Sequence, residues 1–166
     1  MPILSVGSSS KLGRQGVTLL EMLVVVAIVS LIVGVSYPSA SAGLDSIRLA
    51  TTGDDIATFL NSAVNRVERR QQAVEVIISP AEGRLSMYSA GSGYISGLKL
   101  ADGITIEKVL PENPEGPGGT ARSVILIPGA TMPAVGVQFA NRHGARRIVR
   151  IDPMTGFPRV ESVNTT

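Results

Sequence analysis

The chain has 166 residues, of which 44% are hydrophobic, a length that suits one modest domain with a membrane segment and excludes a second full domain. It contains no cysteine, which excludes a disulfide framework and a thiolate metal site. The formal net charge of +2 falls to zero when residues 1–16 are set aside, so charge gives no support for general binding to nucleic acids or anionic membranes.

The first element is an apolar run over residues 17–37, VTLLEMLVVVAIVSLIVGVSY, which contains one charged residue. A helix of these 21 residues, at about 1.5 Å per residue, is roughly as long as the hydrocarbon core of a bilayer is thick. Lys11 and Arg14 precede the run, and the next cation is Arg48. The positive-inside bias therefore predicts a single-pass helix with residues 1–16 in the cytoplasm and the C-terminal part outside.

Glu21 is anomalous in this run, because an ionised carboxylate inside a membrane is costly unless it is paired or protonated. Proteolysis after Gly16 would create a partner at the same depth, since the new α-amine of Val17 would lie one helical turn from Glu21. The pair could form within one chain or between neighbouring subunits. The carboxylate also lies near the positive end of the helix dipole.

These residues resemble the start of a type IV prepilin or pseudopilin, with a short basic leader ending in Gly16, then Val-Thr-Leu-Leu-Glu, a hydrophobic helix and Pro38. In that family a membrane aspartyl prepilin peptidase cuts after the glycine and methylates the new N-terminus. The resemblance implies cleavage between Gly16 and Val17, N-methylation of Val17 and a role for Glu21 in assembly. The processed chain is then expected to enter a helical filament through its N-terminal helix.

Two other interpretations of the apolar run remain open. A secretory signal peptide with an Ala40-x-Ala42 site would release a domain that starts at Gly43, but its h-region would contain Glu21 and exceed the usual length of roughly 7–15 residues. A plain signal anchor would tolerate Glu21 near the membrane interface, but it leaves the Gly-x-x-x-x-Glu spacing unexplained.

A helical region is predicted to continue after the run, with a kink at Pro38 and a weak point at Gly43. An amphipathic helix follows, with Asp54 as its N-cap. Its apolar residues recur at three- and four-residue spacing, so they are interpreted as a face that packs on a sheet. This apolar stripe consists of Ile56, Phe59, Leu60, Ala63, Val64 and Val67.

After Gln72 the apolar period changes from that of a helix to that of a strand. AVEVIIS and RLSMYSA around PAEG predict a hairpin over residues 73–90, and the Gly/Ser-rich GSGYISG that follows is interpreted as a flexible connection. Further strands are predicted in LKLADGITIEKVL, ARSVILIPG and VGVQFANRHG, with a loop over residues 111–119 and a closing hairpin in RRIVRID, PMTG and FPRVESV. About seven strands after the helices predict an α+β fold with one or two antiparallel sheets.

This layout, together with RIVRIDPMTGFPRV near the end, resembles the H-type minor pseudopilins and the related FimT-like minor pilins (FimT/GspH-like proteins). The resemblance implies a pilin-like α+β fold in which a long N-terminal transmembrane helix packs on a small antiparallel β-sandwich. It divides the chain into a prepilin leader peptide (1–16), a transmembrane and assembly helix (17–37), a continuing periplasmic helical region (38–72) and a periplasmic β-rich domain (73–166).

The same resemblance implies a minor pseudopilin at or near the tip of the type II secretion pseudopilus, which supports protein export. Such a subunit is held in the bacterial inner membrane, with its N-terminus cytoplasmic and its C-terminal domain periplasmic, until it enters the filament. The implied partners are the prepilin peptidase, other major and minor pseudopilins, the inner membrane, and secreted cargo or the secretin. The alternative is a FimT-like minor type IV pilin that primes pilus assembly or binds DNA for uptake.

No enzyme activity, cofactor or metal is expected from the motifs in the chain. The sequence has no Gly-x-Ser-x-Gly elbow, HExxH motif, P-loop or EF-hand loop. His143, the single histidine, is interpreted as a solvated loop residue. Asp152 and Thr155 in DPMTG are interpreted as caps of a turn rather than as calcium ligands.

The remaining candidate site is a basic cluster of Arg142, Arg146, Arg147, Arg150 and Arg159. Binding of DNA phosphates by these arginines is one hypothesis. Alternation along a strand places Arg146 and Arg150 on one face and Arg147 on the other, so the cluster is divided. The competing interpretation is a solvated strand face whose arginines pair with Asp152 and Glu161.

Overall fold

The computed structural model describes residues 17–89, 91–112 and 120–163. Contacts group the chain into two compact units, residues 1–39 and 40–166. The predicted leader, with Gly16, lies outside the described residues, as does most of the predicted loop over residues 111–119.

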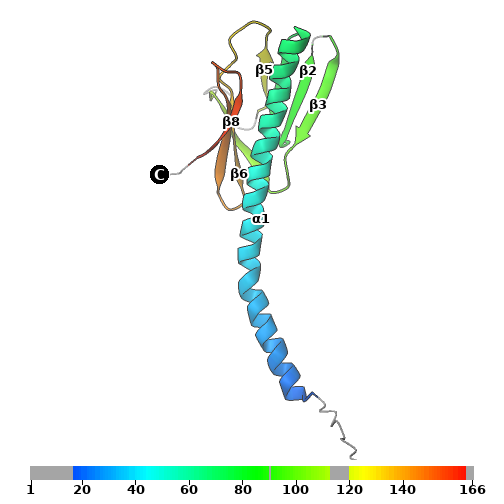
Figure 1. Cartoon of the computed structure of the whole chain (residues 1–166), viewed down its shortest axis with the longest axis vertical. Coiled ribbons are helices and arrows are strands. Elements are labelled where there is room, and N and C mark those ends of the chain that lie inside the picture. The colour runs from blue at the N-terminus through cyan, green and yellow to red at the C-terminus, as the bar shows by residue number, and fades with distance from the viewer. Residues whose placement is uncertain (1–16, 90, 113–119, 164–166) are drawn as a thin grey trace, which may run out of the picture. The chain divides into compact units, whose positions relative to one another are not determined.

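One long helix, α1 (Leu19–Arg70), begins in the first unit and ends in the second (Figure 1). At its C-terminal end, Gln71 adopts a left-handed backbone conformation with a φ of 53°. The N–H of Gln71 donates to the carbonyl of Val67 at 2.9 Å, which closes the last turn. Arg69 and Arg70 in that turn interact favourably with the negative end of the helix dipole.

Eight strands follow α1 in the described part of the chain, and they form two four-stranded antiparallel sheets. The first sheet has the order β3-β2-β1-β5, with β1 (Val74–Ser79), β2 (Arg84–Ser89), β3 (Gly93–Lys99) and β5 (Arg122–Leu126). The second has the order β4-β6-β7-β8, with β4 (Ile104–Leu110), β6 (Gly136–Asn141), β7 (Arg146–Ile151) and β8 (Pro158–Ser162). In Figure 1, β2 and β3 lie to the right of α1, and β6 and β8 lie to its left. This architecture confirms the predicted α+β fold and is consistent with a pilin-like fold.

The strand that the sequence analysis missed is β3, which occupies GYISGLK where a flexible connection was expected. Glycine, which has low β-propensity, occupies two of the seven positions, and the partly buried apolar residues Ile95 and Leu98 are three positions apart, so the stretch lacks the alternation typical of a strand. The strand pairs with β2, and Tyr94 packs edge-on against Tyr88 with ring centroids 5.6 Å apart. The predicted hairpins at both ends of the β-rich part are confirmed as β1–β2 and β7–β8.

The hydrophobic core is shared by α1 and both sheets. All six residues of the predicted apolar stripe on α1 are buried, which confirms that this face packs on the sheets. They belong to the same cluster as Val76 of β1, Leu85 of β2, Phe139 of β6 and Val149 of β7. Each large apolar side chain buried in this way contributes about 1.5–3 kcal/mol.

The predicted helix start at Asp54 was wrong, because α1 continues through Gly43, Gly53 and Asp54. Gly53 lies against the second sheet, where a Cβ atom would come within 3.0 Å of Val160 Cγ1 and 3.3 Å of Phe139 Cζ. The packing that this glycine permits outweighs its low helix propensity, which costs about 1 kcal/mol relative to alanine.

Arg122 links the edges of the two sheets within the second unit. Its Nη1 atom donates to the carbonyl of Val109 at 3.3 Å and also to the carbonyl of Pro111. These bonds occupy backbone acceptors at the end of the edge strand β4, beside Leu110.

Candidate functional site

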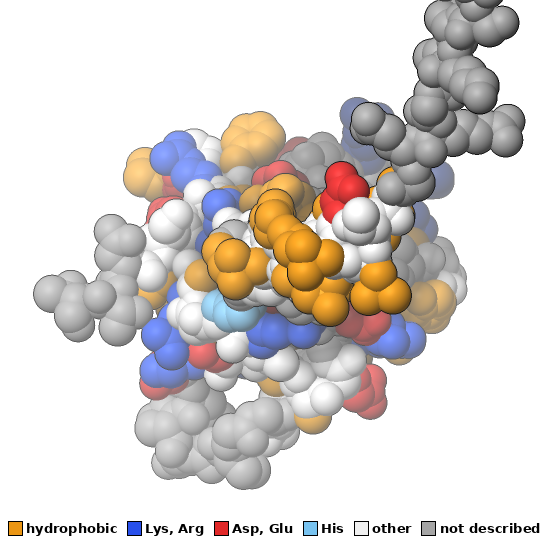
Figure 2. Space-filling view, turned by 90° about the horizontal axis from the view of Figure 1, so that it is seen from below, with side chains coloured by type: hydrophobic (Ala, Val, Ile, Leu, Met, Phe, Trp, Pro, Cys, Tyr) orange, Lys and Arg blue, Asp and Glu red, His pale blue; other side chains and the backbone are white. Residues whose placement is uncertain are grey.

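The first candidate site is the apolar part of α1. Residues 17–36 are all exposed, and Leu19–Ser36 has a mean hydropathy of 2.6, with none of the segment buried. By length and composition this segment is able to cross a membrane. Figure 2 shows hydrophobic side chains gathered on it. A helix that is apolar on every side is stable when lipid or other apolar helices surround it.

Glu21 lies in the first turn of α1, next to a helix cap. Its backbone N–H donates to Thr18 Oγ1 at 3.2 Å, and the helix begins at Leu19. Thr18 and Glu21 therefore occupy the first and last positions of the Ser/Thr-x-x-Glu spacing that defines a capping box. The sequence Thr-Leu-Leu-Glu contains this signal, although the capping role of Thr18 was not predicted from it.

Val17 is exposed immediately before this cap, and Gly16 lies outside the described residues. Cleavage between them would leave Thr18 as the second residue of the processed chain, so the cap would be retained. The cleavage, the methylation of Val17 and the pairing of its amine with Glu21 stay predictions. The same holds for the kink at Pro38, although α1 runs through that position.

The second candidate site, the arginine cluster, is divided in the structure. Arg142 lies in the turn between β6 and β7, and its Nε atom is 3.2 Å from Oδ2 of Asp45 on α1. The same oxygen is 3.0 Å from His143 Nε2, and Arg48 approaches Oδ1 at 3.5 Å. Asn141 fixes this turn by accepting the N–H of His143 at 3.0 Å. The predicted loop position of His143 is confirmed, and the structure adds the contact with Asp45, whose side chain is only 9% exposed.

Arg146 also has a carboxylate partner on another strand. Its Nε atom donates to the two carboxylate oxygens of Glu107 at 3.1 and 2.9 Å. Burial by itself raises the pKa of Glu107, but hydrogen bonds from Gln138 and Arg146 outweigh this effect and hold the pKa below the usual 4.5. The positive charge of Arg146 is therefore largely neutralised by Glu107 within the second sheet.

The turn between β7 and β8 is capped by Asp152 and Thr155, in agreement with the prediction. Asp152 Oδ1 accepts the N–H of Met154 at 2.9 Å, and Thr155 Oγ1 accepts the N–H of Phe157 at 3.4 Å. The Met154 hydrogen bond is the main cause that lowers the pKa of the Asp152 carboxyl. Arg159 Nη2 lies 3.7 Å from Asp152 Oδ2, so a third candidate arginine faces a carboxylate.

The last two candidate arginines lie on opposite faces of β7, as the alternation predicted. Arg147 is on the face of the core residues Val149 and Ile151, while Arg150 is exposed on the outer face and stands opposite Arg159 of β8. The sequence contains no local signal that Asp45 or Glu107 pairs with these arginines, because both carboxylates lie far from them along the chain.

Comparison with known proteins adds one finding. Residues 11–37 match the family model for the prokaryotic N-terminal methylation motif. This stretch contains Glu21 and the apolar segment, and it ends before the β-rich part. No curated protein and no solved structure matches the chain significantly.

Proposed function

From a methylation motif that indicates a type IV pilin-like protein, we propose that the chain is a minor pseudopilin at or near the tip of the type II secretion pseudopilus. Prepilin peptidase removes residues 1–16 and methylates Val17. The helix over residues 17–37 anchors the subunit in the bacterial inner membrane, with the β-rich domain in the periplasm, until the subunit enters the filament. Its role is structural rather than enzymatic.

The observation that carries this proposal is an exposed apolar helix that begins with a capped turn containing Glu21. Lipid covers the apolar side chains before assembly. After extraction neighbouring helices must cover them, because each large side chain left in water costs about 1.5–3 kcal/mol. An ionised Glu21 in such a bundle is tolerated beside a positive charge, and the α-amine of a neighbouring Val17 supplies one. The pair therefore favours one axial register between subunits.

The layout of the second unit supports the H-type assignment, because α1 leads directly into a β-rich part that ends in the β7–β8 hairpin. The alternative is a FimT-like minor type IV pilin that primes pilus assembly or binds DNA. Within this alternative, DNA binding is less favoured than priming of pilus assembly. Each of Arg142, Arg146 and Arg159 faces a carboxylate, which reduces the positive charge offered to phosphates.

The proposal is tested by co-expressing the full chain with prepilin peptidase and the major filament subunit, followed by mass measurement of the N-terminus and isolation of filaments. We expect an N-methylated start at Val17. Glu21→Gln leaves cleavage and membrane insertion intact but lowers incorporation about a hundredfold or more, because breaking a buried pair costs about 3–5 kcal/mol. Glu82→Gln, which removes an exposed carboxylate in the second unit, is the matched control.

Equal incorporation of the Glu21 and Glu82 variants would overturn the pairing, and a start at Gly43 would replace the prepilin interpretation with a secretory signal peptide. Deletion of the gene separates the two filament types. Loss of a type II secreted protein from the medium supports the pseudopilin, whereas loss of DNA uptake with normal secretion supports the minor pilin.

A further inference from the structure

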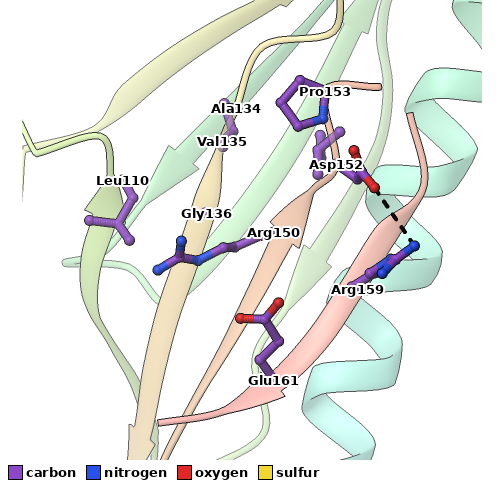
Figure 3. A pocket seen from close by; sticks show the side chains of 10 residues that line it. Leu110, Ala134, Val135, Gly136, Arg150, Asp152, Pro153, Arg159 and Glu161 are labelled. Atoms are coloured by element: carbon purple, nitrogen blue, oxygen red, sulfur yellow. Dashed lines mark ion pairs between the residues drawn. The ribbon is translucent and has the colours of Figure 1, made fainter. Parts of the chain in front are cut away.

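A cavity of about 270 Å³ opens on the second sheet where β7 leads into the β7–β8 turn (Figure 3). It lies wholly within the second unit, so it is independent of assembly through the apolar part of α1. Its lining combines apolar and charged side chains, among them Leu110, Val135, Pro153, Arg150, Arg159 and Glu161.

Two arginines in this lining stand directly opposite each other on neighbouring antiparallel strands, Arg150 on β7 and Arg159 on β8. Like charges in such positions repel each other. Arg159 turns toward Asp152, whereas Arg150 points the other way, across β6 toward Leu110 (Figure 3). Within the described residues, no hydrogen bond or ion pair engages the Arg150 guanidinium.

Gly136 of β6 provides the space in which Arg150 lies. A Cβ atom at Gly136 would be 3.2 Å from Arg150 Cγ and 3.3 Å from Leu110 Cβ. The aliphatic stem of Arg150 therefore rests on β6, which restricts its motion and directs the guanidinium toward the apolar side of the cavity. Because the stem packs on the strand, fewer of its rotamers are lost when the guanidinium binds a ligand.

We propose that this cavity binds a carboxylate on a segment of another protein, with an apolar residue next to the acidic one. The planar guanidinium of Arg150 donates two parallel N–H···O bonds to the carboxylate, and the apolar neighbour packs on the half-buried Leu110. The bound anion also offsets the repulsion between Arg150 and Arg159. A nucleic acid fits this cavity less well, because it is bound through contacts to several phosphates, whereas Arg159 in the lining already faces Asp152 and leaves Arg150 to meet a single carboxylate.

The test uses the full chain in detergent micelles and a fluorescent, end-blocked peptide, acetyl-Gly-Ala-Leu-Glu-Leu-Ala-Gly-amide, with binding followed by fluorescence anisotropy. Replacing the peptide's Glu with Gln weakens binding about tenfold or more, because the charge-assisted bonds are lost. Arg150→Gln causes a loss of the same size. Arg84→Gln, which removes an exposed arginine from the first sheet, changes the affinity less than about twofold.

Gly136→Ala provides a second variant that keeps Arg150 but displaces its stem, and it also weakens binding of the Glu peptide. Equal affinity for the Glu and Gln peptides, or unchanged binding by Arg150→Gln, would overturn the proposal. It is also overturned if a short duplex DNA binds in a way that depends on Arg150 while the Glu peptide does not bind. None of these measurements needs a filament, so their outcome does not depend on whether the proposed assembly function is correct.

Discussion

Two glycines in the second unit's part of α1 offer a direct test of how closely the helix packs on the second sheet. Gly53 is buried, and a Cβ atom there would lie 3.0 Å from Val160 Cγ1 and 3.3 Å from Phe139 Cζ. Gly43 is exposed, and a Cβ atom there would meet no other heavy atom within 4 Å. Replacing each with alanine therefore makes the same chemical change in two different surroundings.

Both substitutions gain about 1 kcal/mol from the higher helix propensity of alanine. At Gly53 the added methyl presses on Phe139, which is fully buried and cannot move without disturbing the core. Such overpacking costs about 1–3 kcal/mol. We therefore expect Gly43→Ala to stabilise the domain by about 1 kcal/mol, and Gly53→Ala to be about 1–3 kcal/mol less stable than Gly43→Ala. The propensity gain cancels in that difference, which isolates the steric effect.

The assay is urea unfolding of the full chain in detergent, followed by tyrosine fluorescence, because Tyr88 and Tyr94 pack together in the first sheet. Equal stabilisation by the two alanines would refute the reasoning, since it would mean that α1 and the second sheet have room for the methyl group.

Three further predictions concern the core and the ion pairs. Leu60→Ala, at a position with 1% exposure, should lower the free energy of unfolding by about 2–5 kcal/mol, measured as a shift in the urea midpoint. The pKa of Glu107, measured by NMR titration, should lie below 4.5 and should rise in Arg146→Gln. Because the pKa of Glu107 is lower in the folded state than in the unfolded state, its ionised carboxylate stabilises the fold. This contribution is complete at a pH above the pKa of the unfolded state and is lost as the pH falls through the pKa of the folded state. Asp45→Ala should destabilise the domain by about 1–3 kcal/mol in the same urea assay, whereas Asp55→Ala, at an exposed position on the same helix, should have little effect.

Local periodicity was sufficient to predict most of the fold. The apolar stripe of α1 and the two hairpins depend on residues a few positions apart, and these predictions are confirmed. The errors arose where a local signal was weak or had a distant cause. The irregular apolar spacing of β3 concealed that strand. A helix start was predicted at Asp54, whereas α1 continues through it and the neighbouring Gly53 lets Phe139 and Val160 approach.

The distinction between local signals and contacts made by the tertiary fold also applies to the candidate sites. The spacing of Glu21 from Gly16 is a local motif, and the methylation match covers it. The arginine cluster was inferred from proximity in sequence, but Asp45 and Glu107 approach it from α1 and β4. The number of arginines in a segment therefore overestimates the positive charge that a ligand encounters, because partner carboxylates are brought in by the tertiary fold. Within the described structure no carboxylate engages Arg147 or Arg150, and nothing in the sequence set these two apart from the other three arginines.

The Thr-Leu-Leu-Glu sequence at the start of α1 has two roles, a helix cap and a negative charge, and the structure assigns them to different groups. Thr18 Oγ1 accepts the backbone N–H of Glu21, so this bond does not use the Glu21 carboxylate. Thr18→Val removes the cap and keeps the charge, which should cost about 1 kcal/mol of helix stability and show as faster amide exchange in the first turn. Glu21→Gln removes the charge and keeps the cap. If pairing with an amine drives assembly, filament incorporation falls strongly for Glu21→Gln and only slightly for Thr18→Val. Equal losses for the two variants would mean that the order of the first helical turn, rather than the charge, controls entry into the filament.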